Sequence, residues 1–277
     1  MWKHRQLIEE SDIVHCHDVF FWYLPLRFLY PTKKVFTTFH GWEGVFPPTY
    51  KAKWVRKLSE KLSWGNICVG DYIKKWYGTK ADYVIYGGTS SPRRSPAESA
   101  GHRRGVFGFR GEVTKILFVG RLDEDTGLRT YLKALETLKT RNINFKIVFA
   151  GDGKLRNEAE KYGNVLGFVK DVERLIPDYR IIFTSGYLSI LEAMVSKRLI
   201  VATYENPLKE DYLKMSPFSN WIIIEKEPLK ISERIEYYLK HPREEKKLVE
   251  QAYEWAKEQT WEKTTQIYLN LWGNPEV

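Results

Sequence analysis

The segment from Ile181 to Thr203, IIFTSGYLSILEAMVSKRLIVAT, constrains the fold more than any other stretch of the chain. A short apolar run, Ile181–Phe183, meets a Thr-Ser-Gly turn, and a segment of helical periodicity then leads to a second apolar run, Leu199–Ala202. Parallel strands need such a crossover, because the helix carries the chain back to the end of the sheet where the next strand begins. The segment therefore predicts an α/β fold with a parallel sheet.

The turn of this segment is a candidate phosphate site. Gly186 allows a ligand to approach the backbone closely, and the helix behind it offers N–H groups that have no intrahelical partner. Glu192 lies one turn into that helix, where a carboxylate can accept hydrogen bonds from the paired hydroxyls of a ribose. Most strand-turn-helix units bind no ligand, so this hypothesis depends on what the rest of the chain places opposite the turn.

Strands and helices alternate along the whole chain, which predicts open, mostly parallel α/β sheets. Four strands are expected in the first part, at 12–17, 34–39, 66–70 and 83–86. A second series is expected at 115–119, 145–150, 165–168, 181–183, 199–202 and 221–224. A helix from 243 to about 271 is expected near the end of the chain.

The pattern divides the chain into two α/β domains, at residues 1–89 and 114–258, with a terminal helix at 259–277. The stretch 90–113 between them has no periodicity and is rich in Ser, Pro, Gly and Arg, which is typical of a linker or a mobile loop. Two such domains imply a cleft between them, and ligands of open parallel sheets bind beyond the carboxyl ends of the strands.

The positive charge of the chain is concentrated in its first part. Residues 1–115 contain 19 Lys and Arg against 10 Asp and Glu, whereas residues 116–277 contain 25 of each, so the net charge of +9 lies in the first part. This asymmetry favours an anionic partner, which charge alone leaves open as a membrane surface, a lipid-linked phosphate or nucleic acid. A solvated, lysine-rich surface is the alternative.

The other bulk features favour a cytoplasmic protein. No apolar run reaches the roughly 18–20 residues of a membrane span, and the opening residues do not resemble a secretory signal. Cys16 and Cys68 both fall in expected strands, which predicts buried thiols in a reducing compartment.

Two further loops carry candidate ligand-binding residues. Arg121 follows an expected strand directly, in Gly120-Arg121-Leu122, and a guanidinium can hold a pyrophosphate through bidentate, permanently charged hydrogen bonds. Gly151-Asp152-Gly153 also follows a strand and could pass close to a ligand. A surface arginine and an ordinary tight turn explain the two loops equally well.

Several motifs occur together in the order and spacing of one enzyme family. The second half contains ILFVGRLDEDTG, FAGDGKLRNEAE, VLGFVKDVERLIPDY and SILEAM followed by RLIVAT. The first half contributes DIVHCHD, TTFHGWE, ICVGDYIKKW and VIYGGTS, and TWEKTTQIYLNLW lies near the end. As an ordered set that runs nearly the whole chain, they resemble the GT-B glycosyltransferases of family 4.

This resemblance implies a GT-B-like fold, two Rossmann-like domains with a cleft between them, and a role for particular residues. Arg121 matches the arginine that holds the donor pyrophosphate, Glu192 the glutamate that binds the ribose, and His40 the histidine that faces sugar and acceptor. The donor-binding residues that it implies beside these are Gly41, Gly120, Thr126, Gly151, Gly153, Thr184, Ser185, Gly186, Tyr187 and Leu188. The terminal helix is expected to pack back on the first domain.

Two positions depart from the family pattern. The family usually has lysine where this chain has Thr126, and a first glutamate where this chain has Thr184. One cation and one carboxylate of the usual donor site are therefore absent. Lys154, Arg129 or the backbone N–H groups of residues 185–187 are candidates to compensate.

Three other sequence features admit a functional interpretation. His15 and His17 lie on one face of an expected strand with Asp18 next to them, but no third metal ligand has suggestive spacing. The acidic triplet 123–125 imitates a metal-binding Asp-x-Asp motif, yet its place after Arg121 favours a solvated acidic turn. The aromatic segment 20–30 could dock on a membrane, although an aromatic stripe after a strand is more often core.

Together these features predict a glycosyltransferase that moves a sugar from a nucleotide-sugar donor to a saccharide or lipid-linked acceptor, with retention and without metal or cofactor. It would be cytoplasmic and peripheral at the inner membrane face, with no nucleic-acid partner. A nucleotide-sugar 2-epimerase of the same fold is one alternative. A non-catalytic subunit that binds sugar nucleotides is another, favoured by Thr126 and Thr184.

The resemblance also implies a first domain that is shortened at its amino end. A full GT-B first domain has further strand-helix units and a glycine-rich loop before the His-x-His strand, which here arrives at Ile13. Only four strands are expected in this domain, where a doubly wound sheet usually has about six. We therefore expect impaired transfer and self-association through the shortened sheet.

Overall fold

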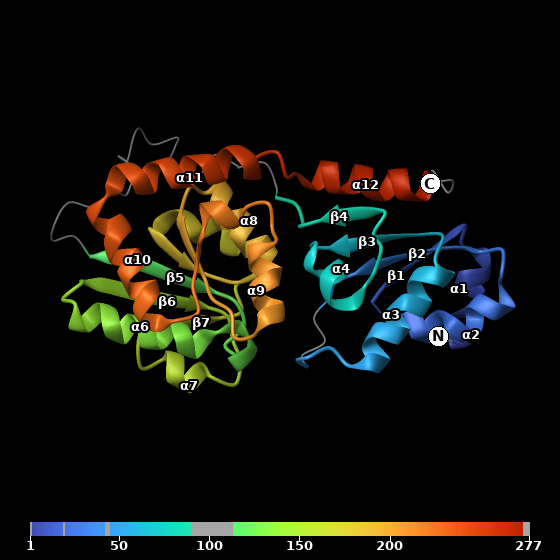
Figure 1. The fold of residues 1–277 in the computed structure, drawn as a ribbon, viewed down its shortest axis with the longest axis horizontal. Coiled ribbons are helices and arrows are strands. Elements are labelled where there is room, and N and C mark those ends of the chain that lie inside the picture. Colours follow the sequence, from blue (N-terminus) through green and yellow to red (C-terminus); the bar gives the residue numbers. More distant parts are fainter. Residues whose placement is uncertain (1, 19, 42–44, 90–112, 274–277) are drawn as a thin grey trace. The chain divides into compact units, whose positions relative to one another are not determined.

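Two α/β units make up the computed structural model, which describes residues 2–18, 20–41, 45–89 and 113–273 (Figure 1). The first unit comprises residues 1–86 and 262–277, and the second unit comprises residues 87–261. Each unit contains one parallel sheet, so the predicted α/β class is confirmed. The expected linker lies outside the described residues apart from residue 113.

The first unit is a four-stranded parallel sheet in the order β1 (Ile13–His17), β2 (Lys34–Phe39), β3 (Gly65–Val69) and β4 (Tyr83–Ile85). Its connecting helices are α1 (Arg5–Glu10), α2 (Phe20–Leu29), α3 (Tyr50–Leu62) and α4 (Tyr72–Tyr77). Successive side chains of a strand point to opposite faces. Val35 accordingly packs with Tyr23 and Leu26 of α2, whereas Phe36 packs with Leu271 on the other face.

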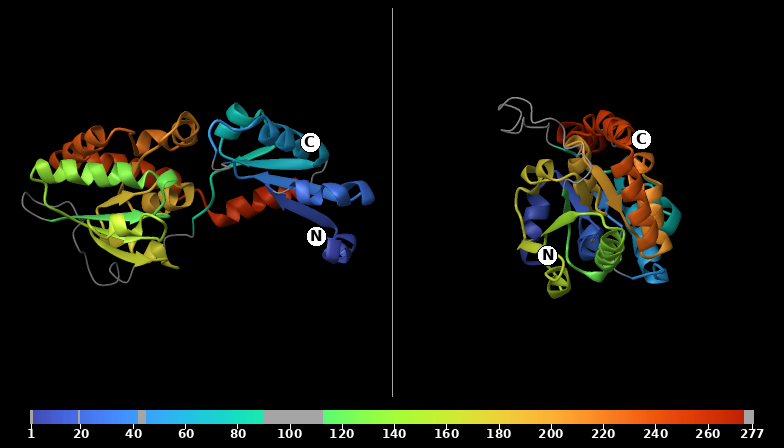
Figure 2. Two further views of the ribbon diagram at one scale, coloured as in Figure 1. Left: turned by 90° about the horizontal axis from the view of Figure 1, so that it is seen from below. Right: turned by 90° about the vertical axis from the view of Figure 1, so that its left-hand side faces the viewer.

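Helix α12 (Trp261–Gly273) covers that second face of the first sheet. In Figure 2 it is the red helix beside the blue strands. Its Trp272 Nε1–H donates a hydrogen bond of 2.9 Å to Nδ1 of His15, and the hydroxyls of Tyr268 and Thr38 are 3.1 Å apart. Helix α12 is thereby fixed to the first sheet by polar contacts as well as by apolar packing.

The expectation of one long terminal helix is wrong. The chain forms two helices, α11 (Pro242–Ala256) and α12, and residues 257–260 between them are not helical. Thr89 occupies this break, because its N–H donates to the carbonyl of Gln259 at 2.7 Å and its carbonyl accepts from Trp261 N–H at 3.3 Å. These strand-like bonds take the place of helical ones.

The second unit is a six-stranded parallel sheet in the order β10, β9, β8, β5, β6, β7. The bounds of its strands are β5 (Thr114–Val119), β6 (Phe145–Ala150), β7 (Asn164–Gly167), β8 (Ile181–Phe183), β9 (Leu199–Ala202) and β10 (Ile223–Ile224). The chain starts at β5, adds β6 and β7 on one side, and then adds β8, β9 and β10 on the other. The direction of winding therefore reverses between β5 and β8, which is where ligands of doubly wound sheets bind.

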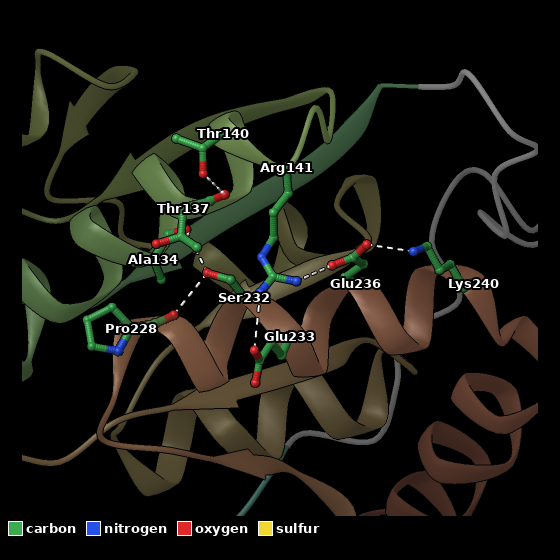
Figure 3. Close-up of polar contacts among 9 residues, drawn as sticks. All are labelled: Ala134, Thr137, Thr140, Arg141, Pro228, Ser232, Glu233, Glu236 and Lys240. Carbon is green, nitrogen blue, oxygen red and sulfur yellow. Dashed lines mark hydrogen bonds and ion pairs between the residues drawn. The ribbon is translucent and has the colours of Figure 1, made fainter.

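Helices pack on both faces of this second sheet. They are α6 (Leu128–Thr140), α7 (Arg156–Ala159), α8 (Tyr187–Val195), α9 (Pro207–Lys214), α10 (Pro228–Lys240) and α11. Figure 3 shows how polar groups join α6 and α10: the buried Ser232 hydroxyl donates towards the carbonyl of Ala134, and Arg141 pairs with Glu233 and Glu236. No helix of the described residues is long and apolar enough to cross a bilayer.

Candidate functional site

The loops that follow β5, β8 and β9 emerge at the same edge of the second sheet. β8 pairs in parallel with β5 on one side and with β9 on the other, so their carboxyl ends are neighbours. The first and third loops also touch, since a Cβ built on Gly127 would lie 2.3 Å from Cγ2 of Thr203. Gly127 has φ +76°, so glycine is needed there both for its backbone conformation and for this close approach.

The hydroxyl of Tyr131 joins these loops. Tyr131 lies on α6 and is fully buried, and its hydroxyl donates to the carbonyl of Val201 at 3.1 Å. The same oxygen accepts from Thr203 N–H at 3.1 Å and lies 3.0 Å from Oγ of Ser185. Ser185 in turn donates to the carbonyl of Thr203 at 3.0 Å. One buried phenol thus fixes the turn after β8 to the end of β9.

Gly151 and Gly153 allow two loops of the sheet edge to cross in contact. A Cβ on Gly151 would lie 1.8 Å from the carbonyl oxygen of Gly120, and one on Gly153 would lie 2.6 Å from that of Leu122. Leu122 N–H donates to the carbonyl of Asp152 at 2.9 Å. Both glycines therefore have a packing role, and donor binding by them stays a prediction.

Arg121 extends from the loop after β5 at the edge where the winding reverses. Its guanidinium, with a side chain 64% exposed, forms ion pairs with Asp123 at 2.9 Å and Asp125 at 2.5 Å. Exposed ion pairs of this kind contribute about 0–1 kcal/mol, so an incoming anion can exchange for a carboxylate at small cost. The position suits a phosphate contact, and the two carboxylates hold the side chain at this edge.

The acidic triplet is only in part the solvated turn that the sequence predicted, since the side chain of Glu124 is 69% exposed. The side chains of Asp123 and Asp125 are only 22% and 33% exposed, and Oδ1 of Asp123 also accepts from Lys154 N–H at 3.1 Å. Glu124 pairs with Arg129, which pairs with Glu158 as well. Arg129, a candidate for the missing cation, is therefore already engaged by two carboxylates.

Thr126 and Thr184, the two departures from the family pattern, both use their hydroxyls locally. Oγ1 of Thr126 lies 2.9 Å from the carbonyl oxygen of Arg121 and 2.7 Å from that of Asp123, so it stabilises the loop that carries the arginine. Thr184 is buried, and its Oγ1 lies 2.5 Å from Oγ of Ser189 on α8. Neither side chain supplies the charge of the residue that the family has in its place.

The N-terminus of α8 is partly satisfied within the protein. Tyr187 N–H donates to the hydroxyl of Tyr212 at 3.0 Å, and the two rings stack with centroids 3.9 Å apart. The backbone of Gly186 has φ −98°, a conformation that any residue can adopt, so the turn does not need glycine for its geometry. The absence of a side chain there leaves space at the turn. Leu188 is 47% exposed and its side chain lies against Gly87. One of the N–H groups expected to hold a phosphate is therefore occupied by Tyr212.

Glu192 has a strongly perturbed carboxyl group. Burial, with a smaller contribution from the nearby charge of Glu173, raises its pKa to about 7. A carboxylate in such a site gains from hydrogen-bond donors, because these favour its charged form. The predicted ribose hydroxyls would be such donors.

His40 and Gly41 lie in the first unit, on the loop after β2, and three side chains hydrogen-bond to their backbone. His40 N–H donates to Asp18 at 2.9 Å, and the carbonyl of His40 accepts from the hydroxyl of Tyr72 at 2.9 Å. The carbonyl of Gly41 accepts from buried Arg56 at 2.6 Å. Gly41 has φ +106°, and a Cβ there would lie 1.7 Å from the Tyr72 hydroxyl, so only glycine fits.

The imidazole of His40 contacts a second histidine. Its Nε2 lies 2.9 Å from Nδ1 of His17, so one ring donates and the other accepts. His15 is engaged by Thr38 and Trp272, and burial together with His17 and His40 lowers its pKa to about 4. Within the described ranges, no three His, Cys, Asp or Glu side chains are grouped so that they could hold a metal ion.

Sequence reasoning missed three residues of the second-unit edge: Tyr131, Thr203 and Tyr212. Tyr131 reads as an ordinary apolar position of an amphipathic helix, and nothing in the sequence shows where its hydroxyl points. Thr203 is buried, and its Oγ1 has no hydrogen-bond partner among the described residues. Buried polar atoms are rarely left so, and this one adds a polar atom to the loop edge.

The pKa of Glu192 generates a stability prediction. A carboxyl whose pKa is about 7 in the folded protein and near 4.5 in the unfolded chain stabilises the fold at low pH. This contribution is lost as the pH rises from about 4.5 through 7. Glu192→Gln, which does not titrate, should therefore raise Tm relative to wild type at pH 8 but have little effect at pH 5. With allowance for its partial exposure, the gain at pH 8 should be roughly 1–2 kcal/mol.

Thermal unfolding of the two proteins between pH 5 and 9 measures this difference. Glu173→Gln is the matched control, since it removes the neighbouring charge and should recover only a part of the gain. A Tm difference between Glu192→Gln and wild type that does not vary with pH would show that the pKa of Glu192 is not raised in the folded protein.

Comparisons with known proteins agree with this geometry. The family model "Glycosyl transferases group 1" matches residues 102–255, which is more than half of the chain. A search of the curated proteins found no match.

Three solved structures are similar over nearly the whole chain. HepE from Anabaena, in complex with UDP, has TM-score 0.71 and 15% identity and covers 98% of this chain and 81% of its own. A glycosyltransferase from Rickettsia africae has TM-score 0.68 and 18% identity, with 97% and 79% covered. An α,α-trehalose-phosphate synthase (UDP-forming) from Burkholderia vietnamiensis has TM-score 0.66 and 12% identity, with 97% and 76% covered.

At these identities the structures establish the fold alone, which is the GT-B fold of glycosyltransferases. The family match and the two parallel α/β units together show that this chain belongs to the glycosyl transferases group 1 family.

Proposed function

We propose that the chain is a family 4 glycosyltransferase that moves a sugar from a nucleotide-sugar donor to a saccharide or lipid-linked acceptor, with retention and without metal or cofactor. One observation carries this proposal. Arg121 and the helix that bears Glu192 follow the adjacent strands β5 and β8, at the point where the winding of the sheet reverses. A guanidinium for phosphate and a carboxylate for ribose thus stand at the place where such sheets bind nucleotides.

The proposed chemistry follows from these charges. Departure of a nucleoside diphosphate places negative charge on its terminal phosphate, and a guanidinium already fixed at that place stabilises it without reorganisation. The N-terminus of α8 contributes its positive dipole end at the same edge. Arg121 would exchange its contacts with Asp123 and Asp125 for the diphosphate. UDP is the first probe to use, since HepE was solved with UDP.

His40 is proposed to face the transferred sugar and the acceptor. The contacts of Asp18 and Tyr72 to its backbone and of His17 to its ring fix one orientation of the imidazole. Such fixed groups lower the cost of orienting a reactant.

A second candidate function is non-catalytic binding of sugar nucleotides. It is favoured by Thr126 and Thr184, whose hydroxyls serve local hydrogen bonds where the family has a lysine and a glutamate. Tight binding of a sugar nucleotide without any turnover over hours, with acceptor saccharides present, would support this function instead of transfer.

Arg121→Ala should weaken UDP binding by roughly 1.5–3 kcal/mol, about ten- to 150-fold, because hydrogen bonds to charged groups are lost. Asp125→Asn should act in the opposite direction, since it removes a carboxylate that competes with the diphosphate for Arg121. Isothermal titration calorimetry at low salt measures both changes. Equal affinities of wild type and Arg121→Ala would remove Arg121 from the site.

We further propose that the first unit docks on an anionic membrane surface, at the cytoplasmic face, through α3. The outer face of α3 carries Tyr50 and Trp54, 93% and 65% exposed. The exposed lysines beside them are Lys51, Lys53, Lys57 and Lys61. Aromatic side chains at the lipid interface and lysines at the head groups are the combination that such surfaces bind.

Vesicles that contain phosphatidylserine test this surface. Wild type should co-sediment with them at low salt and be released by about 0.5 M NaCl, because that salt screens charges beyond a few ångströms. The double substitution Lys51→Glu and Lys53→Glu should abolish binding. The same charge change on α11, Lys246→Glu with Lys247→Glu, should leave it largely intact. Equal loss in both variants would indicate net charge rather than α3.

A further inference from the structure

Lys209 lies at the same edge of the second sheet, on a helix start whose geometry is fixed. Helix α9 begins at Pro207, and the side chain of Asn206 accepts a hydrogen bond of 3.0 Å from Lys209 N–H. Asn at the N-cap and Pro at the first helical position both favour a start at this residue. The side chain of Lys209 therefore leaves the first turn of α9 from a defined position, seven residues after the end of β9.

The ammonium group of Lys209 lies over an aromatic pair that covers the start of α8. Its Nζ is 5.5 Å from the ring centroid of Tyr212. Tyr212 stacks on Tyr187, and its hydroxyl accepts the N–H of Tyr187, the first residue of α8. Lys209 thus reaches the helix terminus at which a phosphate was expected, and where one backbone donor is already occupied.

Lys209 and Arg121 share one carboxylate neighbour, Asp125. Burial lowers the pKa of Lys209, and the positive charge of Arg121 lowers it as well. The negative charges of Asp125 and Glu205 act in the opposite direction. Asp125 in turn forms the ion pair with Arg121. Lys209 on α9 and Arg121 on the loop after β5 therefore both lie within electrostatic range of Asp125, an arrangement that fits an anion with two charged groups.

The other candidates for the second cation are less well placed. Arg129 is held between Glu124 and Glu158, and Thr126 is neutral and bonded to its own loop. Lys154 is tied to this edge through its backbone, because its N–H donates a hydrogen bond to Asp123. A lysine side chain has a flexible four-carbon stem, which allows the ammonium group of Lys209 to move from Tyr212 towards a bound phosphate.

We propose that Lys209 supplies the second cation of the diphosphate site, from α9 instead of from the position of Thr126. The inference rests on the proposed function and assigns one more residue to the same site. Arg121 and Lys209 would hold the two phosphates, and Glu192 would hold the ribose.

The test measures binding of UDP, UMP and uridine by calorimetry to wild type, Lys209→Met and Lys214→Met. Lys214 is the matched control, because it lies on the same helix but is exposed and paired with Glu210. Lys209→Met should weaken UDP binding at least tenfold, weaken UMP binding less and leave uridine binding unchanged. Lys214→Met should bind all three ligands with the affinity of the wild type. Lys209→Arg should recover most of the UDP affinity.

A second measurement guards against a merely structural effect. Asp125→Asn should tighten UDP binding in the wild-type background and clearly less in the Lys209→Met background, since both cations share that carboxylate. UDP affinity that is equal in wild type and Lys209→Met overturns the role of Lys209 but leaves the proposed function intact. Wild type that binds none of UDP, GDP, ADP or pyrophosphate overturns the proposed function and this inference together.

Discussion

The hydroxyl of Tyr131 is the contact on which the candidate site depends most. It joins a helix, the turn after β8 and the end of β9 through Val201, Ser185 and Thr203. Because the ring is fully buried, the hydrogen bonds of its hydroxyl cannot be replaced by water, and losing them would cost about 1–3 kcal/mol. The helices that carry Glu192 and Lys209 follow the turn and the strand end held in this way, and the loop that carries Arg121 leads into the helix that bears Tyr131. The positions of these charged side chains therefore depend on a buried, uncharged contact, the hydroxyl of Tyr131.

The charges around this centre are balanced against one another while no ligand is bound. Arg121 is neutralised by Asp123 and Asp125, burial raises the pKa of Glu192, and Tyr212 occupies a helix N–H. In the proposed site, a phosphate would replace carboxylates at Arg121, and ribose hydroxyls would supply hydrogen-bond donors to Glu192. In this account the site is formed in advance, and ligand binding replaces internal partners instead of creating new structure. The first unit shows the same principle at His40 and Gly41, whose backbone is fixed by Asp18, Tyr72 and Arg56.

The strands of both sheets could be predicted well, because an apolar run bounded by glycine is a local pattern that a few adjacent residues are enough to show. Strands such as Phe145–Ala150 and Leu199–Ala202 match the structure. The single terminal helix was wrong, since its break depends on pairing with Thr89, a residue about 170 positions away that no local pattern reveals. Of the site, Arg121 and Glu192 follow from motifs. Tyr131, Tyr212 and Lys209 did not, because their roles depend on which way a side chain points across the sheet edge. The acidic turn was judged solvated for the same reason.

Hydrogen–deuterium exchange with and without a saturating nucleoside diphosphate tests the central claim most directly. The claim is that the second unit alone provides the donor site, at the carboxyl edge of β5, β8 and β9. Amides of 120–127, 184–192 and 203–209 should gain protection together when UDP or another bound diphosphate is added, while 223–240 should exchange as before. The account is contradicted if the nucleotide binds and protection appears elsewhere, with those three segments unchanged.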